Sequence, residues 1–326
     1  MTAILVTGGA GYVGSHSCKA LASAGFIPVV YDNLSRGHRR AVKWGPCEIG
    51  DIRNRERLDA VLRAYRPAAI LHCAAFAYVG ESVADPALYY DNNVTGSLAL
   101  LEAARAAGIG CVVFSSSCTV YGLPPSMPVA EDMPFAPISP YGRTKVIVEG
   151  MLRDYETGYG IHSIVLRYFN ASGADPGGET GEDHDPEPHL IPRALMAAAG
   201  ELQHLEILGT DYPTPDGTAV RDYIHVTDLA DAHVRALREL TAGGASDTLN
   251  LGTGVGHSVR DIVAAIERIT GKTVPVVKCP RRPGDPAALW AAPGRAHARL
   301  GCSFPHSNLD TIIATAWAWH NRPGRR

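Results

Sequence analysis

The sequence lacks the features that mark several large classes of protein. Its seven cysteines are odd in number and scattered, and none forms a CxxC pair, so neither a disulfide framework nor a cysteine zinc site is expected. It has no run of roughly 18 apolar residues, the length that suggests a membrane span. The first apolar segment leaves no room for a charged leader and cleavage site, so we expect a cytoplasmic protein with no membrane contact.

Positive charge is also too sparse for a nucleic-acid-binding surface. The 30 Lys and Arg residues stand against 33 Asp and Glu, for a formal net charge of -3, and no basic run could neutralise a line of phosphates. Hydrophobic residues, in contrast, make up 46% of the 326 positions. A chain of this size and composition can bury a large core, in one domain or two closely joined ones.

Short apolar runs alternate with segments of helical period in the first half of the chain. This alternation predicts repeated βαβ units, and hence a parallel sheet with helices on both faces. The expected strands are Ala3 to Val6, Ile27 to Tyr31, Ala69 to His72, Cys111 to Ser115 and Ser163 to Leu166. The expected helices are Ser15 to Ala24, Arg55 to Ala64, Asn92 to Ala107 and Tyr141 to Tyr155.

The composition and hydrophobic pattern of the sequence change beyond Asn170, and this change predicts a second domain. Residues 174–188 are rich in Gly, Pro, Asp and Glu and have no apolar period. We therefore expect an α/β fold with a doubly wound parallel sheet of the Rossmann type over residues 1–173, and a smaller α/β substrate domain over residues 174–326. Part of residues 220–240 is expected to pack back on the first domain. Further helices are expected over Ile191 to Ala199, Asp228 to Leu240, Val259 to Thr270 and Leu309 to Trp319.

A glycine-rich turn follows the first expected strand. Gly8, Gly11 and Gly14 form a GxxGxxG pattern ahead of a helical segment. Without Cβ atoms, backbone N–H groups at a helix N-terminus can approach a pyrophosphate closely. The next strand leads to Asp32, whose carboxylate can accept hydrogen bonds from both ribose hydroxyls but repels a 2′-phosphate. The pattern predicts an NAD site, against the alternative of a merely structural turn.

Tyr141 and Lys145 stand four residues apart, which places them on one face of a helix. An ammonium near a phenol favours the phenolate and lowers its pKa, as suits a general base. The same spacing is common on solvated helix faces, so the preceding segment matters. There Ser115 to Ser117 follow a buried strand at its carboxyl end, where ligands bind in open α/β sheets.

Ordered motifs run through nearly the whole chain. They include TGGAGYVGSH at the start, GDIR at 50–53, SSSCTVYG at 115–122, SPYGRTK at 139–145, LRYFNASGADP at 166–176 and PRRPGD at 280–285. In these motifs the chain resembles the extended short-chain dehydrogenases/reductases, and among them the UDP-glucose 4-epimerases. The resemblance implies interconversion of UDP-galactose and UDP-glucose through a 4-keto intermediate, with tightly bound NAD.

The resemblance implies roles for individual residues. Tyr141 would be the base, Ser117 would hydrogen-bond the sugar 4-hydroxyl, and Lys145 would bind the nicotinamide ribose and tune Tyr141. The implied cofactor contacts are Gly8, Gly11, Tyr12, Val13, Gly14, Asp32, Asn33, Asp51, Ile52, Cys73, Ala74, Ala75, Asn92, Ser115, Tyr141, Lys145 and Phe169. The implied UDP-sugar contacts are Ser117, Tyr141, Asn170, His189, Leu190, Leu208, Arg221, Arg282, Asp285 and Leu289.

Three positions depart from the family pattern. Ala77 stands where some members carry a lysine near the cofactor, and His189 stands where an asparagine can bind the diphosphate. Leu289 replaces a bulky tyrosine that can close the sugar pocket. The shorter side chain leaves volume beside C2 of the sugar, which predicts tolerance of N-acetylhexosamines. Pentose donors are also expected to fit, because a pocket that admits a hexose rarely excludes a smaller ring.

Two other functions stay open at this point. A sugar 4,6-dehydratase or a decarboxylating relative shares the fold, the cofactor and the Tyr/Lys pair. The dehydratases, however, carry an acid pair where this chain has Cys118 and Thr119. An NAD-binding regulator without catalysis would keep the fold, but such relatives commonly lose the tyrosine or the lysine.

Two expectations concern partners. By resemblance alone, the helices over residues 92–107 and 141–155 imply a homodimer. No metal is expected, because the spacing of His184, His189 and His204 offers no metal geometry.

Overall fold

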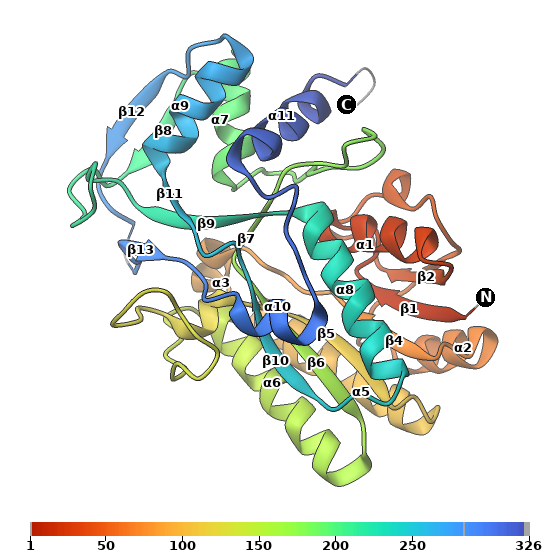
Figure 1. The fold of residues 1–326 in the computed structure, drawn as a ribbon. Coiled ribbons are helices and arrows are strands. Elements are labelled where there is room, and N and C mark those ends of the chain that lie inside the picture. Colours follow the sequence, from red (N-terminus) through yellow and green to blue (C-terminus); the bar gives the residue numbers. More distant parts are fainter. Residues whose placement is uncertain (1, 283, 323–326) are drawn as a thin grey trace.

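A seven-stranded parallel sheet forms the centre of the larger of two lobes (Figure 1). The computed structural model describes residues 2–282 and 284–322. The strand order is β10-β6-β5-β4-β1-β2-β3, so the chain changes direction across the sheet between β1 and β4. The strands are β1 (Ala3–Thr7), β2 (Ile27–Asp32), β3 (Cys47–Ile49), β4 (Ala69–His72), β5 (Cys111–Ser117), β6 (His162–Tyr168) and β10 (Asp247–Leu251).

Helices cover both faces of this sheet, and the alternation of side chains along β1 shows why. Ile4 and Val6 pack into a core with α1 (Tyr12–Ser23) and α8 (Val226–Thr241). Leu5 faces the other way, into a core with the buried sides of three helices. These are α2 (Arg55–Tyr65), α5 (Gly96–Ala106) and α6 (Pro140–Tyr159). Because both faces are covered, the strands read as nearly continuous apolar runs.

Five short elements connect the longer helices and strands of this lobe. Two helices, α3 (Val79–Ala84) and α4 (Pro86–Tyr89), lead into a π-helix at Tyr90–Thr95 that continues as α5. A 3-10 turn at Cys118–Tyr121 follows β5 directly. A second 3-10 turn, at Arg39–Ala41, lies between β2 and β3.

The smaller lobe is built around β9 (Val220–His225). This strand pairs in parallel with β7 (Asn170–Ser172) and β13 (Ala288–Leu289), and antiparallel with β11 (Gly256–Ser258). A separate parallel pair joins β8 (Leu205–Leu208) and β12 (Val276–Cys279). Three helices form the core of this lobe: α7 (Leu190–Ala198), α9 (Val259–Thr270) and α11 (Leu309–His320).

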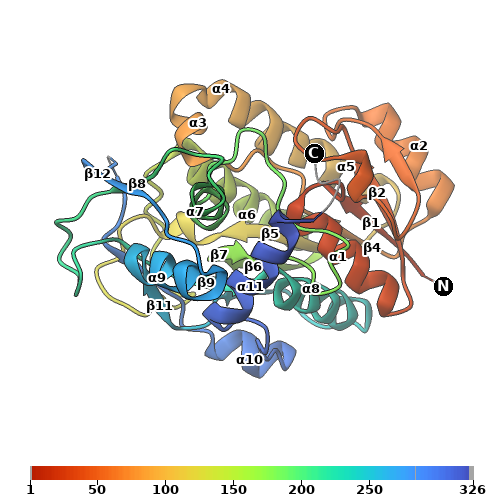
Figure 2. The same cartoon turned by 90° about the horizontal axis from the view of Figure 1, so that it is seen from above.

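Two elements from the second half of the chain lie on the larger lobe. Helix α8 lies beside α1, as Figure 2 shows from above, and β10 pairs with β6 at the end of the large sheet. The short helix α10 (Gly294–Leu300) packs with them through Ala296 and Leu300. The division of the chain at residue 173 therefore stays a prediction, since β10 and α8 come after it.

The predicted α/β class with a doubly wound sheet is confirmed. Each of the five strands expected in the first half is present, and four of them extend one to three residues beyond the expected limits. Strands β3 and β10 were not expected. Among the described residues, no helix is long and apolar enough to cross a membrane.

Candidate active site

The site is organised by the start of helix α6 at the carboxyl edge of the sheet. Ser139 caps this helix, because its side chain accepts a hydrogen bond from the Gly142 backbone N at 3.1 Å. Pro140 occupies the first turn, where its missing N–H costs nothing. The cap fixes Tyr141 in the first turn of the helix, with Lys145 one turn further along the same buried face.

Tyr141, Lys145 and Ser117 lie together and are nearly withdrawn from solvent, with exposures of 8%, 3% and 9%. The Tyr141 hydroxyl lies near Ser117, which lowers the pKa of the phenol. Lys145 Nζ donates to the Ser115 carbonyl at 2.6 Å and lies 5.7 Å from the centre of the Tyr141 ring. The structure therefore brings the three predicted catalytic residues into one cluster.

Burial dominates the protonation of this cluster. It raises the pKa of Tyr141 to about 12, although Ser117 lowers it. Burial also lowers the pKa of Lys145 to about 8, although Cys73 and Glu149 raise it. In the protein alone the pKa of Tyr141 is therefore raised and not lowered, because desolvation outweighs the other influences. The tuning of Tyr141 by Lys145 stays a prediction. The phenol is neutral near pH 7 in the protein alone.

The glycine-rich turn is packed too tightly for any side chain. A Cβ atom on Gly14 would lie 2.1 Å from the Gly8 carbonyl oxygen, and one on Gly8 would lie 2.6 Å from the Ala74 backbone N. Gly8 also has a φ of +72°, which a residue with a side chain rarely adopts. Helix α1 starts directly after Gly11 at Tyr12 and continues through Val13. Its N-terminal N–H groups therefore follow directly on the tight turn, in an arrangement suited to a pyrophosphate.

Asp32 ends β2 beside this turn. Its carboxylate accepts hydrogen bonds from the backbone N atoms of Ala10, at 3.0 Å, and Leu34, at 2.8 Å. Burial raises its pKa, and the two N–H donors lower it. The neighbouring Asn33 donates to Asp51 Oδ2 at 3.0 Å. Asp51 and the buried Ile52 therefore lie beside Asp32, as a binding site for an adenosine would require.

The other predicted cofactor contacts follow the carboxyl ends of three more strands. Cys73, Ala74 and Ala75 come directly after β4, Ser115 lies in β5, and Phe169 follows β6. Asn92 lies in the π-helix, where it donates to Asn93 Oδ1 at 2.9 Å. Asn93 in turn donates to the Phe76 carbonyl at 3.0 Å, which ties the π-helix to the segment after β4. A π-helix within a longer helix is frequent at functional sites.

A cavity of about 210 Å³ lies over the glycine-rich turn. Its floor includes Gly11 and Tyr12, and its opposite wall includes Gly181 and His184 from the smaller lobe's connection to α7. The cavity joins the turn to the second half of the chain, so a ligand held on the turn would touch both.

The predicted UDP-sugar residues fall into two groups. In the first, Asp285 lies 2.8 Å from Arg282 Nη2 and 3.8 Å from Arg221 Nη2. Leu289 pairs with Arg221 in the β13 and β9 register, and Asn170 belongs to β7, which also pairs with β9. The structure thus brings two arginines and one carboxylate together at the smaller lobe.

The second group lies apart from these arginines along the chain. Leu208 ends β8, His189 occupies the N-cap position of α7 without a side-chain capping bond, and Leu190 begins the helix. Sequence reasoning missed Tyr212, which lies near Leu208 in the chain. The ring of Tyr212 lies 4.3 Å from the Arg281 guanidinium, and its buried hydroxyl has no hydrogen-bond partner among the described residues. Asp285 and Arg221 both affect its pKa, which burial raises, so this tyrosine faces the arginine group.

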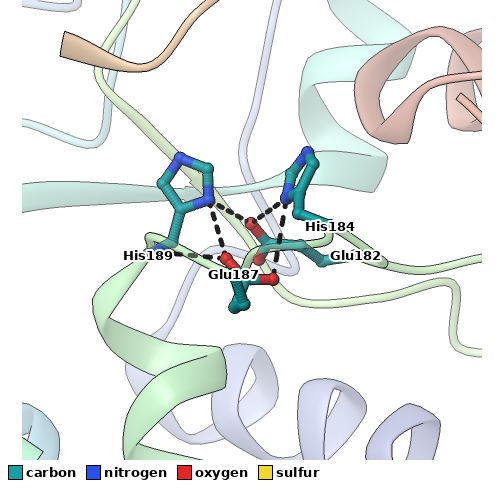
Figure 3. Close-up of side chains that lie close together, drawn as sticks. All are labelled: Glu182, His184, Glu187 and His189. Atoms are coloured by element: carbon teal, nitrogen blue, oxygen red, sulfur yellow. Dashed lines mark hydrogen bonds and ion pairs between the residues drawn. The ribbon is translucent and has the colours of Figure 1, made fainter. Parts of the chain in front are cut away.

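Four side chains of the connection before α7 converge on one point (Figure 3). Glu182, His184, Glu187 and His189 each offer one ligand atom, and these atoms all lie within 4.8 Å of one another. Burial opposes the charged histidines, but the two glutamates outweigh it and raise the pKa of both. The expectation that His184 and His189 offer no metal geometry is wrong, because it considered the histidines without the glutamates. His204 stands outside this cluster.

Comparison with known proteins gives a consistent result. A family model described as "NAD dependent epimerase/dehydratase family" matches residues 4–252 of this chain. The chain is 55% identical to a UDP-glucose 4-epimerase of Rhizobium leguminosarum bv. trifolii over 317 residues, which cover 97% of each chain.

Two solved structures are close in fold. One is a UDP-glucose 4-epimerase from Brucella ovis in complex with NAD, with 56% identity, 98% of each chain covered and a TM-score of 0.96. The other is the UDP-Glc/GlcNAc 4-epimerase of Campylobacter jejuni, with 34% identity, a TM-score of 0.86, and 98% of this chain and 99% of that one covered.

The packing of the glycine-rich turn predicts the effect of a single methyl group. In Gly14→Ala the new Cβ would meet the Gly8 carbonyl oxygen at 2.1 Å, so the turn must open. We expect loss of affinity for NAD, the predicted cofactor, and a free energy of unfolding lowered by about 1–3 kcal/mol. Equilibrium dialysis and urea unfolding measure the two effects.

Gly158→Ala on α6 is the matched control, because nothing lies within 4 Å of a Cβ atom at that position. It should leave cofactor affinity unchanged and stabilise the helix by up to about 1 kcal/mol. Wild-type NAD affinity in Gly14→Ala would contradict the role of the turn.

Proposed function

Since the chain belongs to the NAD dependent epimerase/dehydratase family, we propose that it is an NAD-dependent UDP-glucose 4-epimerase, which interconverts UDP-galactose and UDP-glucose. The observation that carries this proposal is the buried cluster of Tyr141, Ser117 and Lys145 at the carboxyl edge of the sheet. It lies on the same edge as the glycine-rich turn, so a bound dinucleotide and a bound sugar can meet there. Identity of 55% over 97% of the chain to a UDP-glucose 4-epimerase supports the same reaction.

The residues present suit NAD. The turn at Gly8, Gly11 and Gly14 would hold the pyrophosphate, Asp32 the adenosine ribose and Lys145 the nicotinamide ribose. A carboxylate at position 32 opposes a 2′-phosphate, which favours NAD over NADP. When bound, NAD supplies the acceptor for a hydride from C4 of the sugar and the donor that returns it.

The chain's own chemistry is the movement of one proton. Tyr141 removes the proton of the sugar 4-hydroxyl and later returns it to the same oxygen. Ser117 Oγ accepts hydrogen bonds from the Thr119 backbone N at 3.2 Å and from Thr119 Oγ1 at 3.0 Å. Its own hydrogen is therefore left to donate to the phenolate or to the sugar oxygen. The Lys145 ammonium stabilises the phenolate by its charge.

Inversion at C4 requires the sugar to turn while the UDP stays bound. Arg221 and Arg282 would hold the diphosphate, with Asp285 fixing both guanidinium groups. The wall formed by Cys118, Phe169 and Leu289 is apolar. Such a wall offers the sugar few directional contacts, so the ring can present either face to the site.

The dehydratase alternative is disfavoured by the same structure. Dehydration needs a general acid pair beside the sugar. Burial raises the pKa of Cys118 to about 12, which makes this thiol a poor acid near pH 7, and its neighbour Thr119 is a weaker acid still. Both Tyr141 and Lys145 are present and buried, which disfavours a regulator without catalysis.

We also propose that the protein works in the cytoplasm. The seven cysteines are all free thiols in the structure. Thiols persist in a reducing compartment, where disulfides are rare.

The first prediction concerns the base. Tyr141→Phe removes the hydroxyl and keeps the ring, so turnover of UDP-galactose should fall by about 10²–10⁴-fold while NAD affinity is retained. Chromatography separates the possible products: UDP-glucose, a 4-keto-6-deoxy sugar, or none. Tyr159→Phe is the control, since this tyrosine on the same helix is 57% exposed. Near wild-type turnover by Tyr141→Phe would rule out this tyrosine as the base.

The second prediction concerns substrate range. Leu289 leaves room beside C2 of the sugar, and a structural relative from Campylobacter jejuni is described as a UDP-Glc/GlcNAc 4-epimerase. We expect the wild type to use UDP-N-acetylglucosamine as well as UDP-galactose. Leu289→Tyr should lower kcat/KM for UDP-N-acetylglucosamine by about 10–200-fold and that for UDP-galactose much less. Undetectable turnover of UDP-N-acetylglucosamine by the wild type would contradict the proposed range; UDP-xylose in the same panel tests the pentoses.

The third prediction concerns assembly as a homodimer through α5 and α6. Each helix carries an exposed apolar side chain: Leu98 at 45% and Ile147 at 39%. Light scattering should give twice the 34.6 kDa of one chain. The double variant Leu98→Glu/Ile147→Glu should be monomeric, because the new charges would be buried at the interface. Val276→Glu, also at an exposed apolar position on β12, should stay dimeric; a monomeric wild type would refute the proposal.

A further inference from the structure

We propose that Glu182, His184, Glu187 and His189 form a binding site for one divalent transition-metal ion, with Zn²⁺ as the preferred occupant. The site lies on the connection between β7 and α7 and uses two imidazoles and two carboxylates (Figure 3). It stands apart from the Tyr141 cluster but includes His189, one of the predicted UDP-sugar contacts. The ion would have a structural role, described below.

The spacing of the four ligand atoms suits a small cation. His189 Nδ1 lies 2.6 Å from Glu182 Oε1 and 3.1 Å from Glu187 Oε1. His184 Nδ1 lies 3.3 Å from Glu182 Oε1 and 3.6 Å from Glu187 Oε2. Ligands bound tetrahedrally at about 2.0–2.2 Å from Zn²⁺ are roughly 3.3–3.6 Å from one another. Small rotations of the side chains would therefore centre all four on one ion.

The cluster is largely buried and its charges are balanced within it. The side chains of Glu182 and Glu187 are 9% and 6% exposed. In the protein alone, the two carboxylates form ion pairs with His184 and His189, which offset the cost of their burial. One divalent cation would take over this role, because it would neutralise both carboxylates and bind both imidazoles in their neutral form.

The choice of ligands selects the type of metal. Imidazole nitrogen binds Zn²⁺, Cu²⁺, Fe²⁺ and Ni²⁺, whereas Mg²⁺ and Ca²⁺ prefer sites made of oxygen alone. Four protein ligands close the shell of a tetrahedral ion, as in structural zinc sites. The structure thus favours Zn²⁺ over Mg²⁺ or Ca²⁺, and a structural role over a catalytic one.

The surroundings hold the ligand-bearing segment from both sides. The Tyr78 ring contacts both histidines edge-on, with ring centres at 5.7 Å from His184 and 6.2 Å from His189. The Glu182 carbonyl accepts a hydrogen bond from Trp319 Nε1 at 2.9 Å, and the His189 backbone leads directly into α7. Positioned ligands of this kind bind a metal with little rearrangement.

The position of the four ligands between the two lobes implies that a bound ion would stabilise the fold. Just before the cluster, Asp175 forms an ion pair with Lys19 of α1 at 2.7 Å, and Thr180 forms a hydrogen bond with Ser15 at 2.8 Å. Residues 175–189 therefore cross from the smaller lobe to the glycine-rich turn and form one wall of the cavity there. A bound ion would cross-link this segment and should raise the temperature at which the chain unfolds.

The test uses the full-length chain without a purification tag, stripped of metal by a chelator and then given Zn²⁺ alone. Equilibrium dialysis with elemental analysis should find one Zn²⁺ per chain, and the unfolding temperature should rise with Zn²⁺ concentration but not with Mg²⁺. Co²⁺ should give the intense visible d–d absorption of a four-coordinate ion, which Zn²⁺ then abolishes by displacement.

Single variants locate the ion. His184→Gln and Glu187→Gln should each weaken Zn²⁺ binding by at least about 10–100-fold and remove the Co²⁺ absorption. His204→Gln is the matched control, because His204 lies outside the cluster, and it should bind Zn²⁺ as the wild type does. Circular dichroism of the metal-free variants checks that they fold.

Three outcomes would overturn the proposal. They are no retained Zn²⁺ in the wild type, equal binding by either cluster variant, or a Co²⁺ spectrum of the weakly absorbing octahedral type. In the first case the four residues form an ion-pair cluster only. These readouts need no UDP-sugar, so their failure is distinct from a failure of the proposed epimerase reaction.

Discussion

Three successive turns of α6 lie against three successive serines of β5, and the geometry of the site depends on this pairing. Tyr141 lies near Ser117, and Lys145 Nζ donates to the Ser115 carbonyl at 2.6 Å. One turn further, Glu149 accepts a hydrogen bond from Ser116 Oγ at 2.5 Å. Each of these bonds and contacts lies in a buried region, where a misplaced polar group would be costly. The helix therefore cannot slide or rotate on the strand without losing all three.

The third of these bonds is anchored by a buried ion pair. Glu149 and Arg167 are 1% and 4% exposed, and their closest atoms lie 2.6 Å apart. Arg167 also donates to the Tyr121 hydroxyl at 2.7 Å, and Tyr121 donates to Asn250 of β10 at the same distance. A buried ion pair adds little net stability, since desolvation offsets its attraction. Its effect here is positional, because it connects α6, β6 and β10 through directed bonds beneath the catalytic cluster.

Much of the larger lobe could be predicted because its strands are unbroken apolar runs followed by helical periods. Strand β10 could not be predicted in this way, since its sequence Asp-Thr-Leu-Asn-Leu mixes polar with apolar residues. It also lies beyond residue 174, where the composition of the sequence changes. The i, i+4 spacing placed Tyr141 and Lys145 on one helix face, but spacing carries no information on burial, which decides their pKa values. Likewise, the proposed metal-binding cluster could not be predicted from the spacing of the histidines alone, because Glu182 and Glu187 supply half of its ligand atoms. Tyr212 sits in no local pattern, and only the fold brings it to the arginines.

The position of β10 has a consequence for how the chain is made. Strand β6 ends at Tyr168, yet its outer neighbour in the sheet spans residues 247–251. A nascent chain that has left the ribosome as far as β9 still has an unpaired edge along β6, and helix α8 has not yet covered that end of the sheet. Open strand edges invite pairing with other chains. The large sheet is therefore completed only after β7, α7, β8 and β9 of the smaller lobe have been synthesised.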